Sequence, residues 1–372
     1  MTSPESIPRV RAAAWYLLAA LGIMAMLFLV PGMMSAFRLN LLAKYLCFAL
    51  VALGLDLAWG YAGLLSLGQS VFFGLGAYAF GMYLKLESAH GQLPDFMGWS
   101  GLDVLPSYWR PFGDPLFALL VAVGLPGLCG ALLAYLLGRS RIGGVYFSII
   151  TQALAFMATT FFIGQQPFTG GTNGLTNFAT IFGHPLKDAE VQVQLYRVTV
   201  LAVALCLALS LWLARSRFGR LLIALRDDEQ RLRFSGYNPT LLKAAVFGVS
   251  GGMAGLAGAL FVPQVGIVNP DSLGIILGIQ MVIWVAVGGR GTLIGAVLGA
   301  VVVNAAQSAV SESFPDLWQY GIGLLFVATV LIFPGGLANG LQSLGRLALR
   351  AAASRRGEAP APAEAAAELV RA

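Results

Sequence analysis

Apolar runs of about the length needed to cross a bilayer follow one another along most of the chain. A hydrocarbon core of roughly 30 Å is crossed by about 20 helical residues, each of which rises about 1.5 Å. The apolar runs lie at residues 12–30, 41–60, 61–84, 116–137, 145–163, 193–213, 244–265, 272–287, 292–310 and 320–333. They predict an all-α polytopic membrane protein with about ten transmembrane helices, a membrane domain over residues 1–343 and a tail over residues 344–372.

The second and third runs meet at a junction that is rich in glycine and has almost no loop. Glycine lets helices approach closely, and clustered glycines let a helix break. The glycines of this stretch are Gly60, Gly63, Gly68, Gly74, Gly76 and Gly81. We therefore expect close helix packing here, with a break between the two helices.

The longest strongly charged passage between the apolar runs is residues 216–243, SRFGRLLIALRDDEQRLRFSGYNPTLLK. Lys and Arg concentrate in the cytoplasmic loops of membrane proteins. The basic residues in and beside this passage are Arg215, Arg217, Arg220, Arg226, Arg231, Arg233 and Lys243. We therefore place the loop in the cytoplasm.

Ten spans then place both termini on the same side, together with Arg139, Arg141 and Arg290. They also divide into two groups of five, an arrangement typical of inverted repeats, although the halves share no convincing sequence match.

The same passage has the pattern of one short amphipathic helix over residues 220–236. Leu221, Leu222 and Leu225 recur at helical spacing, and charged residues fill the positions between them. Gly236 and the Asn-Pro pair that follows it end the helix.

This helix either lies in the lipid headgroup layer or docks into a groove of a partner protein. Its acidic run, residues 227–229, would be repelled by an anionic leaflet, which favours the protein partner. The residues expected to make the contact are Arg220, Leu221, Leu225, Arg226, Asp227, Asp228, Glu229 and Gly236.

Composition agrees with a membrane protein and excludes a soluble globule. Hydrophobic residues make up 58% of the chain, charged residues only 11%, and the mean hydropathy is +0.78. The net charge of +6 and the pI of about 9.4 reflect basic cytoplasmic loops and not nucleic-acid binding. The cysteines Cys47, Cys129 and Cys206 lie within apolar runs and are expected to be small buried hydrophobic residues. The tail is rich in Ala, Glu and Pro without a periodic apolar face, and we expect it to be disordered.

The chain has none of the patterns expected of a self-contained enzyme. It has no G-x-x-x-x-G-K-[ST] phosphate loop, so we expect no nucleotide site. His90 and His184 lie in predicted outer loops, far from any cluster of metal-ligating residues. We therefore expect no catalytic residues, no metal and no cofactor bound by this chain.

Uncharged polar side chains occur near the middle of several apolar runs. They are Gln69, Gln152, Gln280 and Asn304. A buried amide costs several kcal/mol unless it is hydrogen-bonded, so these residues face either other helices or an aqueous path. As a path they suit a small neutral or zwitterionic solute, because charged residues are scarce in the runs. Asp56, near the inner end of the second run, is a further candidate, with local capping or pairing as the alternative.

The chain resembles the permease subunits of ABC importers of the branched-chain amino acid type over residues 41–337. The resemblance rests on residues 216–243 and on GLDLAWGYAGLLSLGQSVFFGLGAYAFGMYL, SRIGGVYFSIITQAL and VPQVGIVNPDSLGIILGIQMVIWVAVGGRGTLIGAVLGA. More narrowly, LPDFM, GGTNGLTNF and GYNP resemble the larger permease of the urea importers.

The resemblance implies a multi-pass protein of the bacterial inner membrane that pairs with a second related permease. Two ATP-binding subunits would dock from below, and an extracytoplasmic binding protein would deliver the solute from above. The predicted helix at residues 220–236 corresponds to the coupling helix that enters a cleft of the ATPase. This chain departs from the family's E-A-A-x-x-x-G pattern there, having Asp227, Asp228 and Glu229 before Gly236.

The resemblance favours urea as the solute, with a branched-chain amino acid or a short amide as the alternative. An amino acid would need a more apolar path with a partner for its carboxylate. A channel or secondary carrier that works without ATP is less favoured, because neither needs a coupling loop, and a purely structural scaffold does not need polar residues at mid-depth. In the importer, Gly288, Gly289 and Gly291 are expected to absorb backbone changes when access switches.

Overall fold

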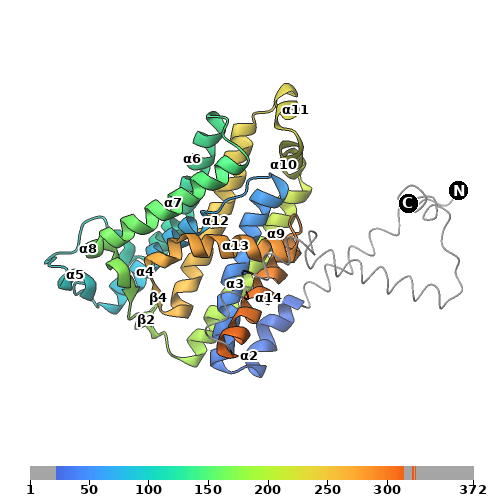
Figure 1. Ribbon diagram of the computed structural model, residues 1–372. Helices are drawn as coiled ribbons and strands as arrows, with labels where there is room; N and C mark the ends of the chain where they lie inside the picture. The colour runs from blue at the N-terminus through green and yellow to red at the C-terminus, as the bar shows by residue number, and fades with distance from the viewer. Residues whose placement is uncertain (1–21, 314–320, 322, 324–372) are drawn as a thin grey trace, which may run out of the picture.

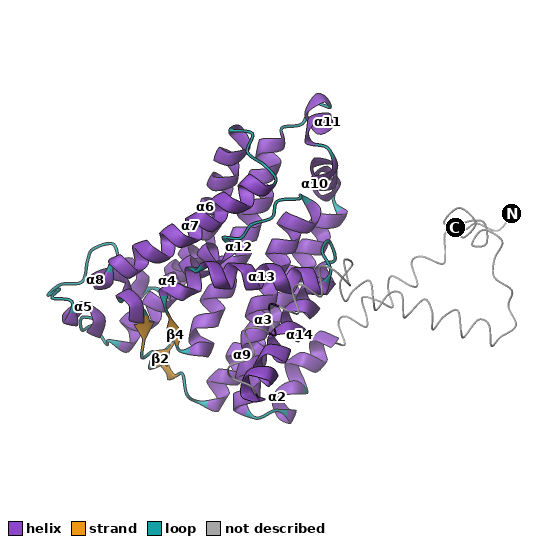
Figure 2. Ribbon diagram, viewed as in Figure 1, coloured by secondary structure: helices purple, strands orange, loops and turns teal. Residues whose placement is uncertain are grey.

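The computed structural model describes residues 22–313 together with 321 and 323. The helices in this part form one bundle, with the connecting segments gathered at its two ends (Figures 1 and 2). The predicted tenth span, the predicted tail and the first half of the predicted first span lie outside the described residues.

Each predicted span from the second to the ninth contains a helix. These helices are α3 (Ala36–Asp56), α4 (Gln69–Ser88), α6 (Pro115–Arg139), α7 (Val145–Gly164), α9 (Ala189–Arg215), α12 (Pro239–Val265), α13 (Ile275–Gly288) and α14 (Leu293–Ser313). Within the described residues, six helices are long and apolar enough to cross a membrane; the short α13 and the more polar α4 are not among the six. The all-α polytopic fold is therefore confirmed.

The junction between the second and third spans differs from the prediction of almost no loop. The chain leaves α3 through the π-helical turn η1 (Leu57–Tyr61), and α4 begins only at Gln69, eight residues after the predicted start at residue 61. Backbone groups of the non-helical stretch bond to α7: the Ser148 hydroxyl donates to the Leu65 carbonyl at 2.8 Å, and the Leu67 amide donates to Thr151 Oγ1 at 3.1 Å. Irregular backbone at membrane depth requires such partners, so α7 stabilises the break.

The centre of the bundle is formed by α3, α4 and α12, which pack through small residues. In the span formed by α3 and η1, 83% of an 18-residue apolar stretch is buried inside the protein, whereas the corresponding share in α6 and in α7 is 22%. A Cβ on Gly258 of α12 would lie 2.0 Å from the Phe73 carbonyl oxygen of α4. The central helices therefore approach to backbone contact, and the apolar outer faces of α6, α7 and α9 are left for lipid.

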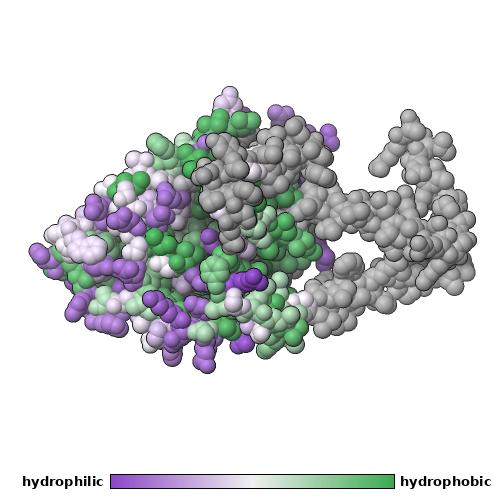
Figure 3. All heavy atoms as spheres, turned by 60° about the horizontal axis from the view of Figure 1, so that its bottom comes forward, coloured by the Kyte–Doolittle hydropathy of each residue, from purple (hydrophilic) through white to green (hydrophobic). Residues whose placement is uncertain are grey.

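Short elements cover the end of the bundle that the charge pattern assigns to the outside. They are α2 (Val30–Met33), α5 (Asp95–Trp99), η2 (Arg110–Gly113), α8 (Gln166–Thr169) and η3 (Gly171–Asn173), with the strands β1 (Leu175–Thr176), β2 (Thr180–Ile181), β3 (His184–Pro185) and β4 (Ile267–Val268). The turn η4 (Pro270–Leu273) lies deeper, beside the first turns of α4, where the Ser70 hydroxyl donates to the Leu273 carbonyl at 3.0 Å. Antiparallel pairs form between β1 and β4 and between β2 and β3. The alternation of apolar and polar residues did not predict these strands, because each has only two residues. Figure 3 shows hydrophilic side chains around the α5 side of this end and hydrophobic ones toward the middle.

The GGTNGLTNF segment is attached to β4 by a backbone contact that only glycine permits. Gly174 has a φ of +66°, and a Cβ on it would lie 2.0 Å from the Val268 carbonyl oxygen. The segment therefore sits directly beside the chain that leads into η4.

At the opposite end, the predicted single amphipathic helix is two helices, α10 (Arg217–Asp227) and α11 (Glu229–Phe234). Ser216 caps α10, accepting hydrogen bonds from the amides of Phe218 and Gly219. Asp228 has an extended backbone and caps α11, accepting from the Arg231 amide at 2.9 Å. An acidic residue that caps a new helix ends the old one, which is why one helix became two.

Candidate functional site

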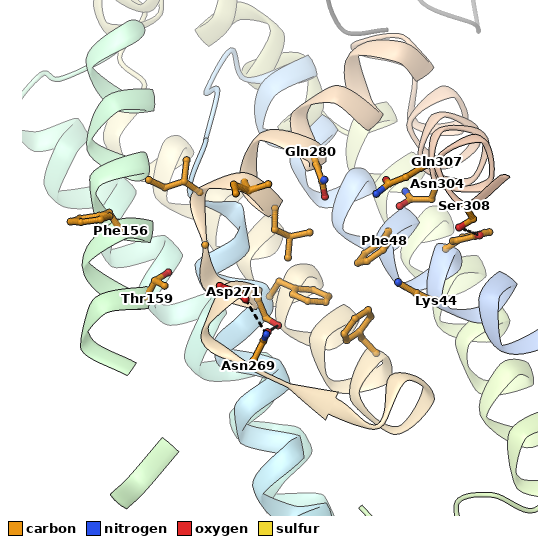
Figure 4. A pocket seen from close by; sticks show the side chains of 18 residues that line it. Lys44, Phe48, Phe156, Thr159, Asn269, Asp271, Gln280, Asn304, Gln307 and Ser308 are labelled. Carbon is orange, nitrogen blue, oxygen red and sulfur yellow. Dashed lines mark hydrogen bonds between the residues drawn. The ribbon is translucent and has the colours of Figure 1, made fainter. Parts of the chain in front are cut away.

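A cavity of about 620 Å³ lies between α3, α7, α13, α14 and the η4 segment (Figure 4). Its lining residues are Lys44, Tyr45, Phe48, Phe73, Phe156, Thr159, Phe261, Asn269, Asp271, Ser272, Gly274, Ile275, Ile276, Leu277, Gln280, Asn304, Gln307 and Ser308. The volume suits a small organic solute.

One wall of the cavity is polar and is made by α13 and α14. In Figure 4, Gln280 lies beside the pair Asn304 and Gln307. The Asn304 side-chain amide donates to the Ala300 carbonyl at 2.8 Å, one helical turn back. That bond uses one donor of the amide and leaves its oxygen available to the cavity.

Two charged residues belong to the same lining. The Lys44 Nζ atom lies 5.9 Å from the centroid of the Phe48 ring, on α3. Asp271, in η4, accepts a hydrogen bond from the Asn269 side-chain amide at 3.0 Å. In Figure 4 the two charged side chains approach the cavity from different sides. The cavity therefore offers a cationic donor and an anionic acceptor at separate positions.

Aromatic rings close one side of the cavity. Phe48 lies 5.5 Å from Phe261 and 4.6 Å from Trp284 between ring centroids, and Phe73 lies 5.2 Å from Phe261. Beyond Phe48, the rest of α3 toward the cytoplasmic end is buried. The cavity therefore lies beside the outer half of α3, and the buried stretch of that helix continues from it to the cytoplasmic end.

The structure brings together two of the four amides that the sequence proposed for the solute path. Gln280 and Asn304 line the cavity, whereas Gln152 is half-buried on α7 outside its lining. Gln69 is fully buried, and its side-chain amide donates to the Ser250 carbonyl at 3.1 Å and to the Ser250 hydroxyl at 2.9 Å. Gln69 thus makes a bond between α4 and α12, which was the alternative reading for these residues.

The sequence reasoning missed the charged lining residues Lys44 and Asp271, and also Gln307. A lysine inside an apolar run is itself a signal of function. Asp271 gave no comparable signal, because its position beside the cavity depends on how η4 folds back over α13.

The apolar face of the cytoplasmic loop packs against the chain itself. Leu225 is buried, Leu221 is half-buried, and Leu222 and Leu232 join the same core. Glu229 is bound by two cations: its carboxylate contacts Lys243 Nζ at 2.7 Å and an Arg233 guanidinium nitrogen at 3.2 Å.

The exposed side of this loop carries the other predicted contact residues. Arg220, Asp227, Asp228 and Gly236 are exposed, with Asp228 also acting as the cap of α11. Phe234, which the sequence analysis did not single out, is 92% exposed. Any partner of this loop therefore meets the charged side of α10 and the Phe234 ring, and not the leucine face.

A cluster of backbone and charged groups joins α10 to the cytoplasmic ends of α3 and α13. Arg226 donates to the Gly60 carbonyl at 2.8 Å, and Arg290 donates to the Trp59 carbonyl at 3.2 Å. Burial is the main cause that lowers the pKa of Arg290; Arg226 lowers it further and Asp56 opposes the shift. The two arginines are therefore close neighbours, drawn together by carbonyls of η1 despite their like charge.

Comparison with known proteins identifies the family of the chain. A family profile described as "Branched-chain amino acid transport system / permease component" matches residues 37–330. The chain belongs to this permease family. The permease is 27% identical over 331 residues to the high-affinity branched-chain amino acid transport system permease protein LivM of Salmonella typhimurium, covering 82% of this chain and 71% of the relative.

Two further relatives show how widely the similarity extends. The permease is 23% identical over 298 residues to the high-affinity branched-chain amino acid transport system permease protein BraD of Pseudomonas aeruginosa, covering 78% of this chain and 91% of the relative. It is 34% identical over 149 residues to the autoinducer 2 import system permease protein LsrC of Salmonella paratyphi B, covering 38% of this chain and 42% of the relative. No solved structure is significantly similar to the chain. The permease is thus a multi-pass transport subunit of the bacterial inner membrane, of the branched-chain amino acid type of ABC transporter, and not an enzyme.

Proposed function

We propose that this permease carries an amino acid with an aliphatic side chain through the cavity between α3, α13 and α14. The observation that carries the proposal is the joint presence of Lys44, Asp271 and an apolar wall in one cavity. A zwitterion needs a donor for its carboxylate and an acceptor for its ammonium group, and its side chain needs apolar contact. Phe48 and Ile275 are part of that apolar wall.

Two of the relatives support the same solute class, since LivM and BraD are named as branched-chain amino acid permeases. Those names describe the relatives. We extend the solute class to this chain because its cavity has the charged and apolar lining residues that an amino acid needs.

Urea is the second candidate, and the amide cluster favours it. Gln280, Asn304 and Gln307 supply donors and acceptors without charge, which is what a neutral amide-like solute needs. Urea has no carboxylate, however, and so offers the Lys44 side chain a carbonyl acceptor but no opposite charge.

We further propose that transport is driven by ATP on two partner subunits that bind the cytoplasmic loop. A second, related permease and an extracytoplasmic binding protein complete the importer. The exposed charged side of α10 and the exposed Phe234 support a protein partner for this loop. An ATP-independent channel or carrier has no need for such a surface, and co-purification of an ATPase subunit distinguishes the two cases.

Uptake into proteoliposomes that hold the complete importer tests the solute. We expect ATP-dependent uptake of labelled leucine, and we expect Lys44→Gln to reduce it by about tenfold or more, since a hydrogen bond to a charged group contributes about 1.5–3 kcal/mol. Arg110→Gln, which removes an exposed cation from the outer side, is the matched control and is expected to leave uptake unchanged. ATP-dependent uptake of urea without uptake of leucine would show that the amino acid assignment is wrong.

A further inference from the structure

Three segments that are far apart in sequence meet at the cytoplasmic end of the bundle. They are the last turn of α10, the π-helical turn η1 and the loop that joins α13 to α14. Two consecutive carbonyls of η1 serve as the meeting point: that of Trp59 accepts from Arg290, and that of Gly60 accepts from Arg226. The Arg290 guanidinium also lies 5.1 Å from the centroid of the Trp59 ring.

A buried carboxylate fixes the loop end of this junction. Asp56, on the last turn of α3, is fully buried, and its Oδ1 accepts from the Gly291 amide at 2.7 Å. There is no space between the two segments, since a Cβ on Gly60 would lie 2.4 Å from Asp56 Oδ1 and 2.6 Å from the Gly291 amide nitrogen. In a low-dielectric setting a hydrogen bond to a carboxylate is strong and its loss is costly.

The loop held by Asp56 is rigidly connected to the polar wall of the cavity. A Cβ on Gly288 would lie 2.1 Å from the Gly295 carbonyl oxygen, and one on Gly299 would lie 2.2 Å from the Trp284 carbonyl oxygen. Backbone contact at two levels makes α13 and α14 one packed hairpin. This hairpin carries Gln280 on one helix and Asn304 on the other.

The opposite wall of the cavity is connected to the same junction, because η1 continues directly from α3, which carries Lys44 and Phe48. A displacement of α10 that pulls on Gly60 therefore acts where both walls of the cavity end. Packed elements move as units and do not deform continuously, so such a pull would shift one wall relative to the other.

We propose that Arg226, Asp56 and Arg290 are positioning residues that transmit movement of α10 to the cavity. Arg226 bonds α10 to η1, and Asp56 and Arg290 bond the end of α3 and η1 to the α13–α14 hairpin. This inference rests on the proposed function, since it takes α10 as the element that the ATPase moves. It differs from docking, because Arg226 acts inward on its own chain. Loss of the junction leaves ATP hydrolysis in place and removes its effect on the solute.

The test is the amount of leucine imported per ATP hydrolysed by the complete importer in proteoliposomes. We expect Arg226→Ala and Asp56→Leu to lower this ratio about tenfold or more while the ATPase subunits still co-purify and hydrolyse ATP. Asp56→Asn keeps an oxygen for the Gly291 amide and is expected to restore most of the ratio. Arg139→Ala, which removes an exposed arginine from the cytoplasmic end of α6 and leaves α10 intact, is the matched control and is expected to keep the wild-type ratio.

An unchanged ratio in Arg226→Ala and Asp56→Leu overturns the proposal, and so does loss of the ATPase subunits from Arg226→Ala, because that result assigns Arg226 to docking. Where the Arg226→Ala permease itself does not fold into the membrane, Arg226→Lys replaces it, since lysine keeps the charge and lacks the planar fork of arginine.

A second measurement does not depend on the solute. Spin labels on Ala224→Cys and Ile279→Cys, both at exposed positions and outside the cavity lining, report the distance between α10 and α13 in a background without the native cysteines. We expect ATP to change this distance in the otherwise unmodified importer and to leave it unchanged when Arg226→Ala is added. The proposal is overturned if ATP does not change the label distance in the otherwise unmodified importer, or if ATP changes it equally with and without Arg226→Ala. If the distances change as expected but the unlabelled importer takes up no leucine, only the proposed solute is wrong.

Discussion

Gly255 lies where α12 crosses α6, and the absence of a side chain there sets how closely the two helices approach. A Cβ at this position would lie 2.1 Å from the Ala122 carbonyl oxygen. Backbone atoms cannot move aside as the end of a flexible side chain can. The close contact between α6 and α12 therefore requires glycine at position 255, because any side chain would collide with the backbone of α6.

We expect Gly255→Ala to destabilise the permease by about 1–3 kcal/mol, the usual cost of overpacking a well-packed interface. Gly252→Ala is the matched control, because a Cβ there meets its nearest neighbour at an ordinary 3.6 Å. Thermal unfolding of the two variants in detergent provides the measurement. Equal midpoints would show that α6 and α12 adjust to the methyl group.

The amides illustrate what single residues reveal before the structure is known. Their cost in a membrane predicts that each has a polar partner, and Gln69 has one in Ser250. Which of them faces a cavity depends on helix rotation, which hydropathy does not define when the helix is apolar all round. For this reason Gln280 and Asn304 lie together in the cavity lining whereas Gln152 lies outside it.

At the scale of elements, hydropathy located the membrane helices well but predicted their ends poorly. The start of α4 was misplaced because residues 62–68 are apolar enough to read as helix, and only their bonds to Ser148 and Thr151 of α7 make the break stable. The division of the cytoplasmic helix was missed for a related reason, since Asp228 fits a charged helical face as well as it fits a cap.

The cap at Asp228 makes the existence of α11 testable. Asp228→Ala removes the acceptor for the Arg231 amide, and loss of an N-cap costs about 1 kcal/mol. Because α11 is short and its surface is mostly exposed, we expect roughly fivefold faster hydrogen exchange over residues 231–234. Asp227→Ala, which changes an exposed neighbouring carboxylate, is the control for exchange in this segment. Equal exchange in both variants would mean that α11 does not depend on the cap.

For the whole molecule, the decisive property is which end faces the cytoplasm, because both the coupling loop and the outward-lying cavity are assigned from it. Arg226 and Arg290 lie together at the end assigned to the cytoplasm, whereas the cavity residues Lys44 and Asp271 lie nearer the opposite end. The coupling loop and the outward-lying cavity are therefore consistent with the same orientation. The distribution of arginine and lysine along the sequence predicts this orientation. It could not supply the cavity, whose walls come from segments more than 200 residues apart in the chain, such as Lys44 and Asn304.

Labelling with a membrane-impermeant maleimide tests the orientation directly. Phe234→Cys and Tyr108→Cys place thiols at exposed positions on opposite ends of the bundle. In intact bacteria we expect the Tyr108→Cys variant to react and the Phe234→Cys variant to remain unlabelled; in inverted membrane vesicles the pattern should reverse. The unmodified permease is the control, because two native cysteines, Cys47 and Cys206, are buried and Cys129 is half-buried within α6. Labelling of Phe234→Cys in intact cells would place α10 and α11 outside, beyond the reach of any ATPase, and both the coupling proposal and the junction built on it would be wrong.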